Sequence, residues 1–187
     1  ERSELFLARD RAGKKPLYYC RPAPGLLVFG SEVRALLESG LVERRLDPAG
    51  LEVYLANGYT IAPQTMVRGV RSLLPGHFMR VGIDGTVRET GAYWRPPRPV
   101  LSRRAVTEEE FEESRRVFQD AVTQRLVSDV PLGVFLSGGM DSSAIVGAIA
   151  QSAANLHTFS VSFHEKQYDE SEHSRRIASF WKSTHTE

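Results

Sequence analysis

Short apolar runs alternate with turn-forming residues in the first part of the chain. Residues 5–8, 16–20 and 26–29 are mostly apolar, and the stretches 10–13 and 22–25 between them contain Gly together with Asp or Pro. Apolar runs of this length, bounded by turn formers, predict β-strands joined by tight turns. The first part of the chain is therefore expected to be β-rich.

Helices are expected where a capping residue precedes a helical pattern. Ser31 should open a short helix through residue 37, Asp47 a second helix through 56, and Thr107 a long helix through about 127. Three glutamates follow Thr107, which is the capping-box form with acids in the first turn. Between the second and third helices, Asp84-Gly85 predicts a β-hairpin turn.

The pattern changes in the second half of the chain. Residues 132–136 form an apolar run without charge, which predicts a strand buried on both faces of a parallel sheet. A helix is expected from Asp141 to about 150, and residues 157–163 alternate serines with apolar side chains as a strand does. A strand-helix-strand unit of this length implies a right-handed parallel crossover.

The junction between that apolar run and the helix carries the candidate chemistry. A strand, a glycine turn and a helix N-terminus together form an anion site, because backbone N–H groups converge there beside a partial positive charge. Ser137, Ser142 and Ser143 add hydroxyl donors. The Asp141 carboxylate would repel a phosphate unless a divalent cation lay between them. The junction therefore predicts a nucleoside triphosphate site with magnesium.

Other interpretations of the same turn stay open at this point. A Walker-type loop needs a lysine, which is absent here. A nucleophile elbow around Ser137 needs a glycine where Phe135 stands. A plain strand-to-helix turn, with glycines for close packing, would also satisfy the pattern.

Composition narrows the class of protein. The chain has 187 residues and a formal net charge of +1, so its charge indicates neither a nucleic-acid nor a membrane partner. No apolar run reaches the length of a membrane-spanning helix. Because Cys20 is the single cysteine, the chain has no internal disulfide, and this favours a reducing, cytoplasmic location. Cys20 itself is expected to pack in the interior as a small hydrophobic residue. The histidines and the cysteine show no zinc-like spacing.

Two motifs carry a resemblance to known families. The segment from Ser137 to Ser143, Ser-Gly-Gly-Met-Asp-Ser-Ser, resembles the pyrophosphate-binding loop of the ATP pyrophosphatase superfamily. Arg9-Asp10, Gly13 and 15–19, followed by Phe-Gly-Ser-Glu at 29–32, resemble the end of the glutaminase domain in class II glutamine amidotransferases. In this order, the two motifs resemble the glutamine-hydrolysing asparagine synthetases.

The resemblance implies a mixed α/β and α+β architecture. Residues 1–95 would form the C-terminal part of an Ntn-type glutaminase sandwich with a connecting region, and 96–107, which contains Arg-Pro-Pro-Arg-Pro, would be a linker. Residues 108–187 would form the first part of a Rossmann-like, parallel-sheet ATP pyrophosphatase domain. The chain begins at Glu1 without a methionine and ends in a strand-like run, so it is expected to be a fragment.

The resemblance also implies site residues. Asp10 would hold the α-amino group of glutamine, although an Asp at this position equally starts a turn. The nucleophilic cysteine would lie upstream of Glu1, so no catalytic residue is expected within the chain. His77 could be a base, or could simply bond a turn. Asp141 would face Mg²⁺, and the expected ATP contacts are Leu136, Ser137, Gly138, Gly139, Asp141, Ser142, Ser143 and Val161.

The implied reaction is the ATP-dependent amidation of aspartate to asparagine with ammonia from glutamine, through β-aspartyl-AMP. Its partners would be glutamine, aspartate and ATP, with Mg²⁺ as cofactor, and the resemblance allows a homodimer of the full-length protein. A second nucleotide-binding segment of the family is absent, so residues 1–187 alone are expected to bind ATP weakly and to catalyse nothing. A related ligase acting on another carboxylate, β-lactam-forming or peptide-modifying, and a non-catalytic nucleotide-binding module are the alternatives.

Overall fold

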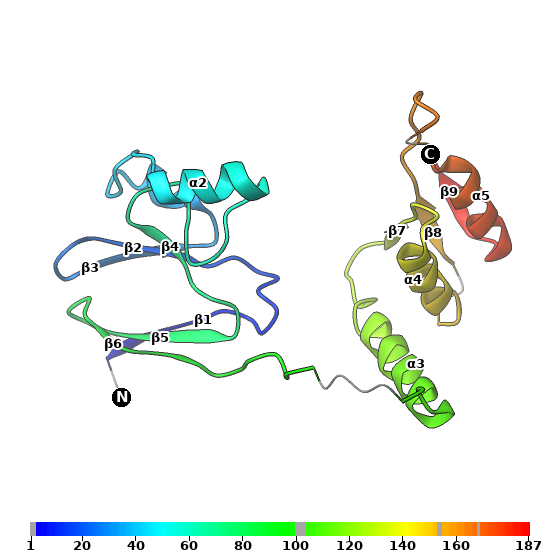
Figure 1. Ribbon diagram of the computed structural model, residues 1–187, viewed down its shortest axis with the longest axis horizontal. Coiled ribbons are helices and arrows are strands. Elements are labelled where there is room, and N and C mark those ends of the chain that lie inside the picture. The colour runs from blue at the N-terminus through cyan, green and yellow to red at the C-terminus, as the bar shows by residue number, and fades with distance from the viewer. Residues whose placement is uncertain (1–2, 100–103, 153–154, 168) are drawn as a thin grey trace. The chain divides into compact units, whose positions relative to one another are not determined.

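The computed structural model describes residues 3–99, 104–152, 155–167 and 169–187 (Figure 1). The chain divides into two compact units, Glu1–Val100 and Leu101–Glu187. Part of the expected linker, residues 100–103, lies outside the described residues. Among the helices that are described, none combines the length and the apolar character needed to cross a lipid bilayer.

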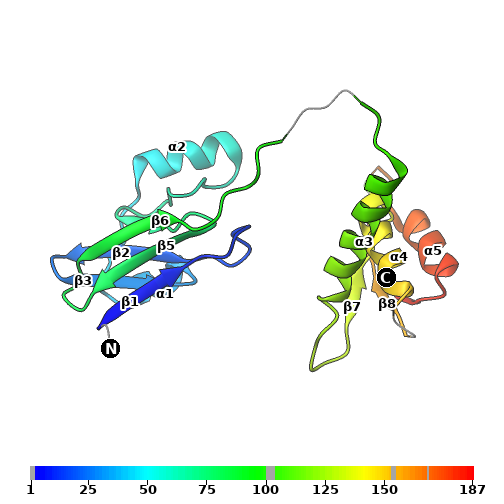
Figure 2. The ribbon, with the colours of Figure 1, turned by 90° about the horizontal axis from the view of Figure 1, so that it is seen from below.

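The first unit contains two antiparallel three-stranded sheets, which lie one above the other (Figures 1 and 2). One sheet has the order β1-β5-β6, with β1 at Glu4–Ala8, β5 at His77–Gly82 and β6 at Val87–Ala92. The other has the order β3-β2-β4, with β3 at Leu26–Gly30, β2 at Tyr18–Ala23 and β4 at Val70–Ser72.

Strand alternation explains how the two sheets meet. In β5, Met79 and Val81 are buried and point to one face, as the period of two residues requires. They pack with Leu7 of β1 and with Tyr19 and Leu27 of the other sheet. The β-rich character and the hairpin turning at 84–85 are confirmed. Whether this unit is an Ntn-type sandwich stays a prediction.

Two helices accompany the β3-β2-β4 sheet. In α1 (Val33–Glu38), the buried Leu36 packs with Cys20 and Val70, so this sheet is apolar on its second face as well. The prediction that Ser31 caps α1 is wrong: Glu32 is the N-cap, in an extended conformation and without a side-chain cap bond.

The second helix of this unit begins as its sequence predicts. In α2 (Pro48–Asn57), the Asp47 side chain accepts bonds from the N–H groups of Ala49 and Gly50, which satisfies donors of the first turn. Gly58 ends α2 in the left-handed conformation, with φ of 77°.

The second unit contains a three-stranded parallel sheet in the order β7-β8-β9. Its strands are β7 at Gly133–Phe135, β8 at His157–Phe159 and β9 at Thr184–Thr186. Its helices are α3 at Glu108–Thr123, α4 at Met140–Ala150 and α5 at Ser171–Phe180. The parallel strand-helix-strand arrangement of β7, α4 and β8 is confirmed, and so is the capping box at Thr107.

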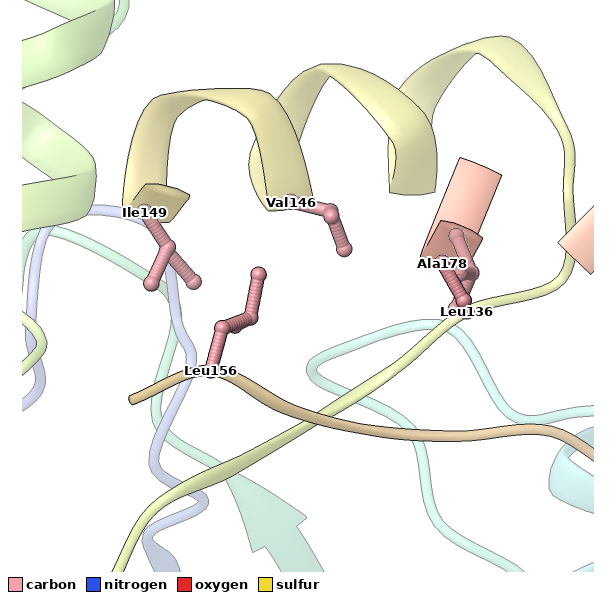
Figure 3. Close-up of a cluster of buried hydrophobic side chains, with 5 residues drawn as sticks. All are labelled: Leu136, Val146, Ile149, Leu156 and Ala178. Atoms are coloured by element: carbon pink, nitrogen blue, oxygen red, sulfur yellow. The ribbon is translucent and has the colours of Figure 1, made fainter. Parts of the chain in front are cut away.

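One apolar cluster joins the helices to this sheet. Figure 3 shows the side chains of α4 and α5 turned toward those of the strand region. Val122 of α3 and Leu126, just beyond the end of α3, pack at the edge of this cluster. The Gln119 side chain of α3 donates to the Ala148 carbonyl at 2.7 Å. The five buried members are Leu136, Val146, Ile149, Leu156 and Ala178.

Three predicted features of this unit need correction. Residues 132–136 are not buried on both faces, since Phe135 is 80% exposed while Leu136 is 1% exposed. The reason is that α4 and α5 pack their apolar side chains into the same core, on the face of the sheet that carries Leu136. No described helix covers the opposite face, which carries Phe135. The strand expected at 157–163 ends at Phe159, and the helix expected through 127 ends at Thr123.

Candidate functional site

The Ser137–Ser143 turn leaves the sheet at the carboxyl end of a parallel strand. The Leu136 N–H donates to the Phe159 carbonyl at 2.7 Å, so the backbone remains paired one residue beyond β7. The chain then turns, and α4 begins at Met140. In open α/β sheets, ligands bind outside the carboxyl ends of the strands. The turn therefore lies where this architecture places a ligand.

Of the two glycines in the turn, only Gly138 is required by the fold. Its φ of 78° is in the left-handed region, and an added Cβ would lie 2.5 Å from the Cβ of His173. Gly139, the N-cap of α4, has a φ of −70°, and the atom nearest to its would-be Cβ is Ser137 Oγ at 3.4 Å. Gly138 thus lets the turn approach the start of α5.

The serine hydroxyls of the turn gather around Gly139. Ser137 Oγ and Ser142 Oγ lie 3.0 Å apart, and Ser142 and Ser143 donate to the Gly139 carbonyl at 3.2 and 2.7 Å. The Gly139 N–H donates to Ser137 Oγ at 3.4 Å. A hydroxyl hydrogen rotates freely, so each group can exchange these internal bonds for a phosphate oxygen.

Asp141 lies in the first turn of α4, and its side chain is exposed. A carboxylate is stabilised there by the helix dipole. In the part of the chain that is described, no group of three or more His, Cys, Asp or Glu side chains could hold a metal ion. Mg²⁺ is usually held by one or two carboxylates together with substrate phosphates, so a single carboxylate beside an anion site fits Mg²⁺ bound with a nucleotide.

A pocket of about 190 Å³ lies next to the turn. It brings together three of the predicted ATP contacts, Leu136 and Ser137 from the end of β7 and Val161 beyond β8. Sequence reasoning missed its other polar residues, because the approach of α5 to the turn is a tertiary contact. The complete lining is Phe135, Leu136, Ser137, Phe159, Ser160, Val161, Phe163, Glu170 and Ser174.

A larger hollow of about 1040 Å³ lies along α3. Its lining is mainly Glu and Arg side chains in exposed ion pairs, such as Glu113 with Arg116 at 2.8 Å. Exposed pairs of this kind satisfy each other in solvent and contribute little energy. The hollow along α3 includes neither the glycine turn nor the carboxyl end of a strand, so we place the site at the smaller pocket beside the turn.

Asp10 is held within its own loop. Its two carboxylate oxygens accept the N–H groups of Lys14 and Lys15, each at 2.9 Å, and these bonds lower the pKa of the carboxyl. The neighbouring Arg9 guanidinium ties the loop to β4 through the Ser72 hydroxyl at 3.0 Å, and to the residue after β4 through the Leu73 carbonyl at 2.7 Å. The geometry therefore shows the turn-forming role of Asp10, and its role toward glutamine stays a prediction.

Two further residues that could have carried chemistry, His77 and Cys20, have structural roles in the first unit. The His77 ring, through Nδ1, bonds the Pro75 carbonyl at 2.8 Å, as expected for a histidine that fixes a Pro-Gly turn. Cys20 is buried in the core, and this burial raises the pKa of its thiol. A buried thiol with a raised pKa is a poor nucleophile, so the prediction of a packed small hydrophobe is confirmed.

Comparison with protein families supports the two-part organisation. Residues 1–94 match the glutamine amidotransferase domain, and residues 113–187 match asparagine synthase.

Curated relatives resemble the chain over most of its length. Asparagine synthetase [glutamine-hydrolyzing] 3 of Bacillus subtilis is 37% identical over 175 residues, which cover 88% of this chain and 27% of the relative. Putative asparagine synthetase [glutamine-hydrolyzing] 2 of Methanocaldococcus jannaschii is 30% identical over 187 residues, 97% of this chain and 35% of the relative. Amidase chyE of Penicillium rubens is 32% identical over 196 residues, which cover 96% of this chain and 28% of the relative. The chain thus spans about a third or less of the length of these relatives.

Proposed function

The chain belongs to the family of glutamine-hydrolysing asparagine synthetases, and from this membership we propose that the full-length protein amidates aspartate to asparagine. The ammonia would come from glutamine, and ATP would activate the aspartate. The family match supports a glutamine-dependent amidation ligase. Aspartate, ATP and the intermediate are part of the proposal.

One observation supports the proposal most strongly. The glycine turn lies at the carboxyl end of β7 and at the N-terminus of α4, and it opens onto the pocket that contains Leu136, Ser137 and Val161. A turn and pocket in this arrangement suit a nucleotide, since the phosphates would meet the helix N-terminus and the base would meet the apolar lining.

The residues of the turn have distinct parts in the proposed site. Backbone N–H groups at Gly138 and Gly139 and the three serine hydroxyls would hold the phosphate oxygens. Asp141 would hold Mg²⁺, which when bound neutralises charge on the phosphates. Leu136 and Val161 would contact the nucleoside. These assignments follow the residues that the turn and the pocket bring together.

The proposed chemistry has two bond exchanges. An oxygen of the aspartate β-carboxylate forms a bond to the α-phosphorus of ATP, and the bond from that phosphorus to pyrophosphate breaks. The ammonia nitrogen then attacks the acyl carbon of β-aspartyl-AMP, AMP leaves with the electrons of the C–O bond, and the nitrogen loses a proton. The turn contributes by stabilising the negative charge that pyrophosphate carries away.

Pyrophosphate release by the full-length protein tests this function. It should be measured with ATP, Mg²⁺ and an ammonium salt against a panel of carboxylic acids that includes aspartate, glutamate and a β-amino acid. Aspartate-dependent release with matching asparagine formation is expected. Release with another acid would assign the protein to a related ligase, and nucleotide binding without release under any condition would indicate a non-catalytic module; either result would contradict the proposal.

A further inference from the structure

A hydrogen-bond chain runs beneath the nucleotide pocket and has no part in the function proposed above. His185 of β9 bonds Thr158 of β8 through Nδ1 at 2.9 Å, and Ser160 through Nε2 at 3.1 Å. Thr158 is fully buried, and the His185 side chain is 13% exposed. Ser160 is a lining residue of the pocket. The imidazole therefore connects the interior of the sheet to the pocket wall.

The far end of the chain sets its direction. Thr158 Oγ1 lies 2.8 Å from Ser183 Oγ, and Ser183 donates to the Ala178 carbonyl at 3.4 Å. With its hydrogen directed at this carbonyl, the Ser183 hydroxyl accepts from Thr158, and Thr158 in turn accepts from His185 Nδ1–H, which is the tautomer that the inference uses. Nε2 of the neutral ring is then an acceptor, and the Ser160 hydroxyl donates to it.

The charged group nearest to the ring is already paired. Glu187 Oε1 lies 3.6 Å from His185 Nε2, but the Glu187 carboxylate accepts from Arg175 Nε at 2.5 Å and from an Arg175 terminal nitrogen at 2.9 Å. The Arg175 guanidinium lowers the pKa of Glu187. At 3.6 Å, Glu187 Oε1 is beyond hydrogen-bond distance of Nε2, so the bonded partner of Nε2 is Ser160 at 3.1 Å.

We propose that His185 is a positioning residue that turns Ser160 into a hydrogen-bond acceptor for the nucleoside in the pocket. With its hydrogen directed at Nε2, Ser160 Oγ presents lone pairs to the pocket, and these would accept from a hydroxyl or amino group of the ligand. The inference rests on the proposed nucleotide site, and it assigns a specificity role to two residues outside the glycine turn.

A double-mutant cycle in the full-length protein tests this inference. Ser160→Ala and His185→Asn should each raise KM for ATP about fivefold with little change in kcat, which is the effect of one neutral hydrogen bond. The double variant should be no worse than either single one, because both remove the same contact. In His185→Gln the side-chain carbonyl reaches the Nε2 position, so KM should return toward that of the unmodified protein.

Controls separate this inference from the function itself. Ser179→Ala, on an exposed part of α5, should leave KM unchanged. Thermal unfolding of each variant reports loss of fold. If His185→Asn does not fold, the KM for ATP of Ser160→Ala alone tests the inference. Additive effects of the two substitutions, or an unchanged KM in Ser160→Ala, would overturn the role of His185 while the proposed function stands. An unmodified protein that binds no ATP would instead overturn the proposed function.

Discussion

At the scale of single residues, the two adjacent glycines of the turn differ in what they tolerate. Gly138 combines a positive φ with a close approach to α5, whereas Gly139 has an ordinary φ and a Cβ there would meet Ser137 Oγ at an ordinary contact distance of 3.4 Å. Neighbouring identical residues in one loop therefore serve as matched positions for substitution.

We expect Gly138→Ala to destabilise the second unit and to weaken nucleotide binding. The left-handed conformation alone costs about 1–2 kcal/mol for an L-residue, and the contact with His173 adds to it. Urea unfolding of the full-length protein, followed through the transition of the second unit, should show a lower midpoint.

Gly139→Ala is the control for this substitution, since its new methyl group would meet only the Ser137 hydroxyl at ordinary distance. It should change the free energy of unfolding by less than about 1 kcal/mol, because the substitution introduces neither a strained φ nor a steric clash. Equal losses in the two variants would show that the contact with α5 is not what requires Gly138.

At the scale of elements, the start of α3 depends on ionisation. Glu110 accepts from the Thr107 N–H at 3.0 Å and bonds the Arg104 guanidinium. The bond from Arg104 is the main cause that lowers the pKa of Glu110 from 4.5 to about 2, and the bond from Thr107 contributes further. A carboxyl whose pKa is lower in the folded state stabilises that state only while it is ionised.

We therefore expect the contribution of Glu110 to α3 to be complete above pH 4.5 and to be lost as the pH falls toward 2. Thermal unfolding of the unmodified protein and of Glu110→Gln should differ at pH 6, and the two midpoints should converge at the acid end of that window. Glu109→Gln, in the same turn but outside the capping box, is the control. A difference that persists unchanged at pH 2 would contradict the capping-box assignment.

Local signals in the sequence predicted most of these elements. Asp47 and Thr107 bond the first turns of their helices because capping depends on neighbouring residues alone. The short strand β4 was missed, since its pairing with β2 is a long-range contact without a turn signal of its own. Burial of residues 132–136 was overestimated, because an apolar run does not show how many faces of a sheet are covered.

The candidate site was predictable to a similar degree. The turn from Ser137 to Ser143 follows from its own sequence. The pocket beside it could not be predicted, because Ser160 and Glu170 reach it only through the pairing of β7 with β8 and the placement of α5. The chain from Thr158 through His185 was also hidden, since alternating polar residues in a strand normally indicate a solvent-facing surface.

At the scale of the whole molecule, the two compact units separate the two partial reactions of the proposal. In the proposal, the domain to which the first unit belongs would use glutamine, and the domain to which the second unit belongs would use ATP. We expect Asp10→Asn to raise KM for glutamine about 10- to 100-fold, the effect of losing one charge-assisted hydrogen bond. Asparagine formation from an ammonium salt should be retained.

Asp84→Asn is the matched control, because Asp84 is an exposed turn carboxylate of the same unit that accepts the Thr86 N–H at 3.1 Å. It should leave both activities unchanged. A parallel fall of the glutamine- and ammonia-dependent activities in Asp10→Asn would limit Asp10 to its structural part in the loop.

The most direct test of the central claim is the affinity of the full-length protein for ATP, titrated with and without Mg²⁺. With Mg²⁺ we expect Asp141→Asn to weaken binding by more than about tenfold, because the carboxylate holds the cation that neutralises the phosphates. Without Mg²⁺, Asp141→Asn should bind ATP no more weakly than the unmodified protein, since a carboxylate without a cation repels the phosphates. An Asp141→Asn variant that keeps the full Mg²⁺-dependent affinity would contradict the account.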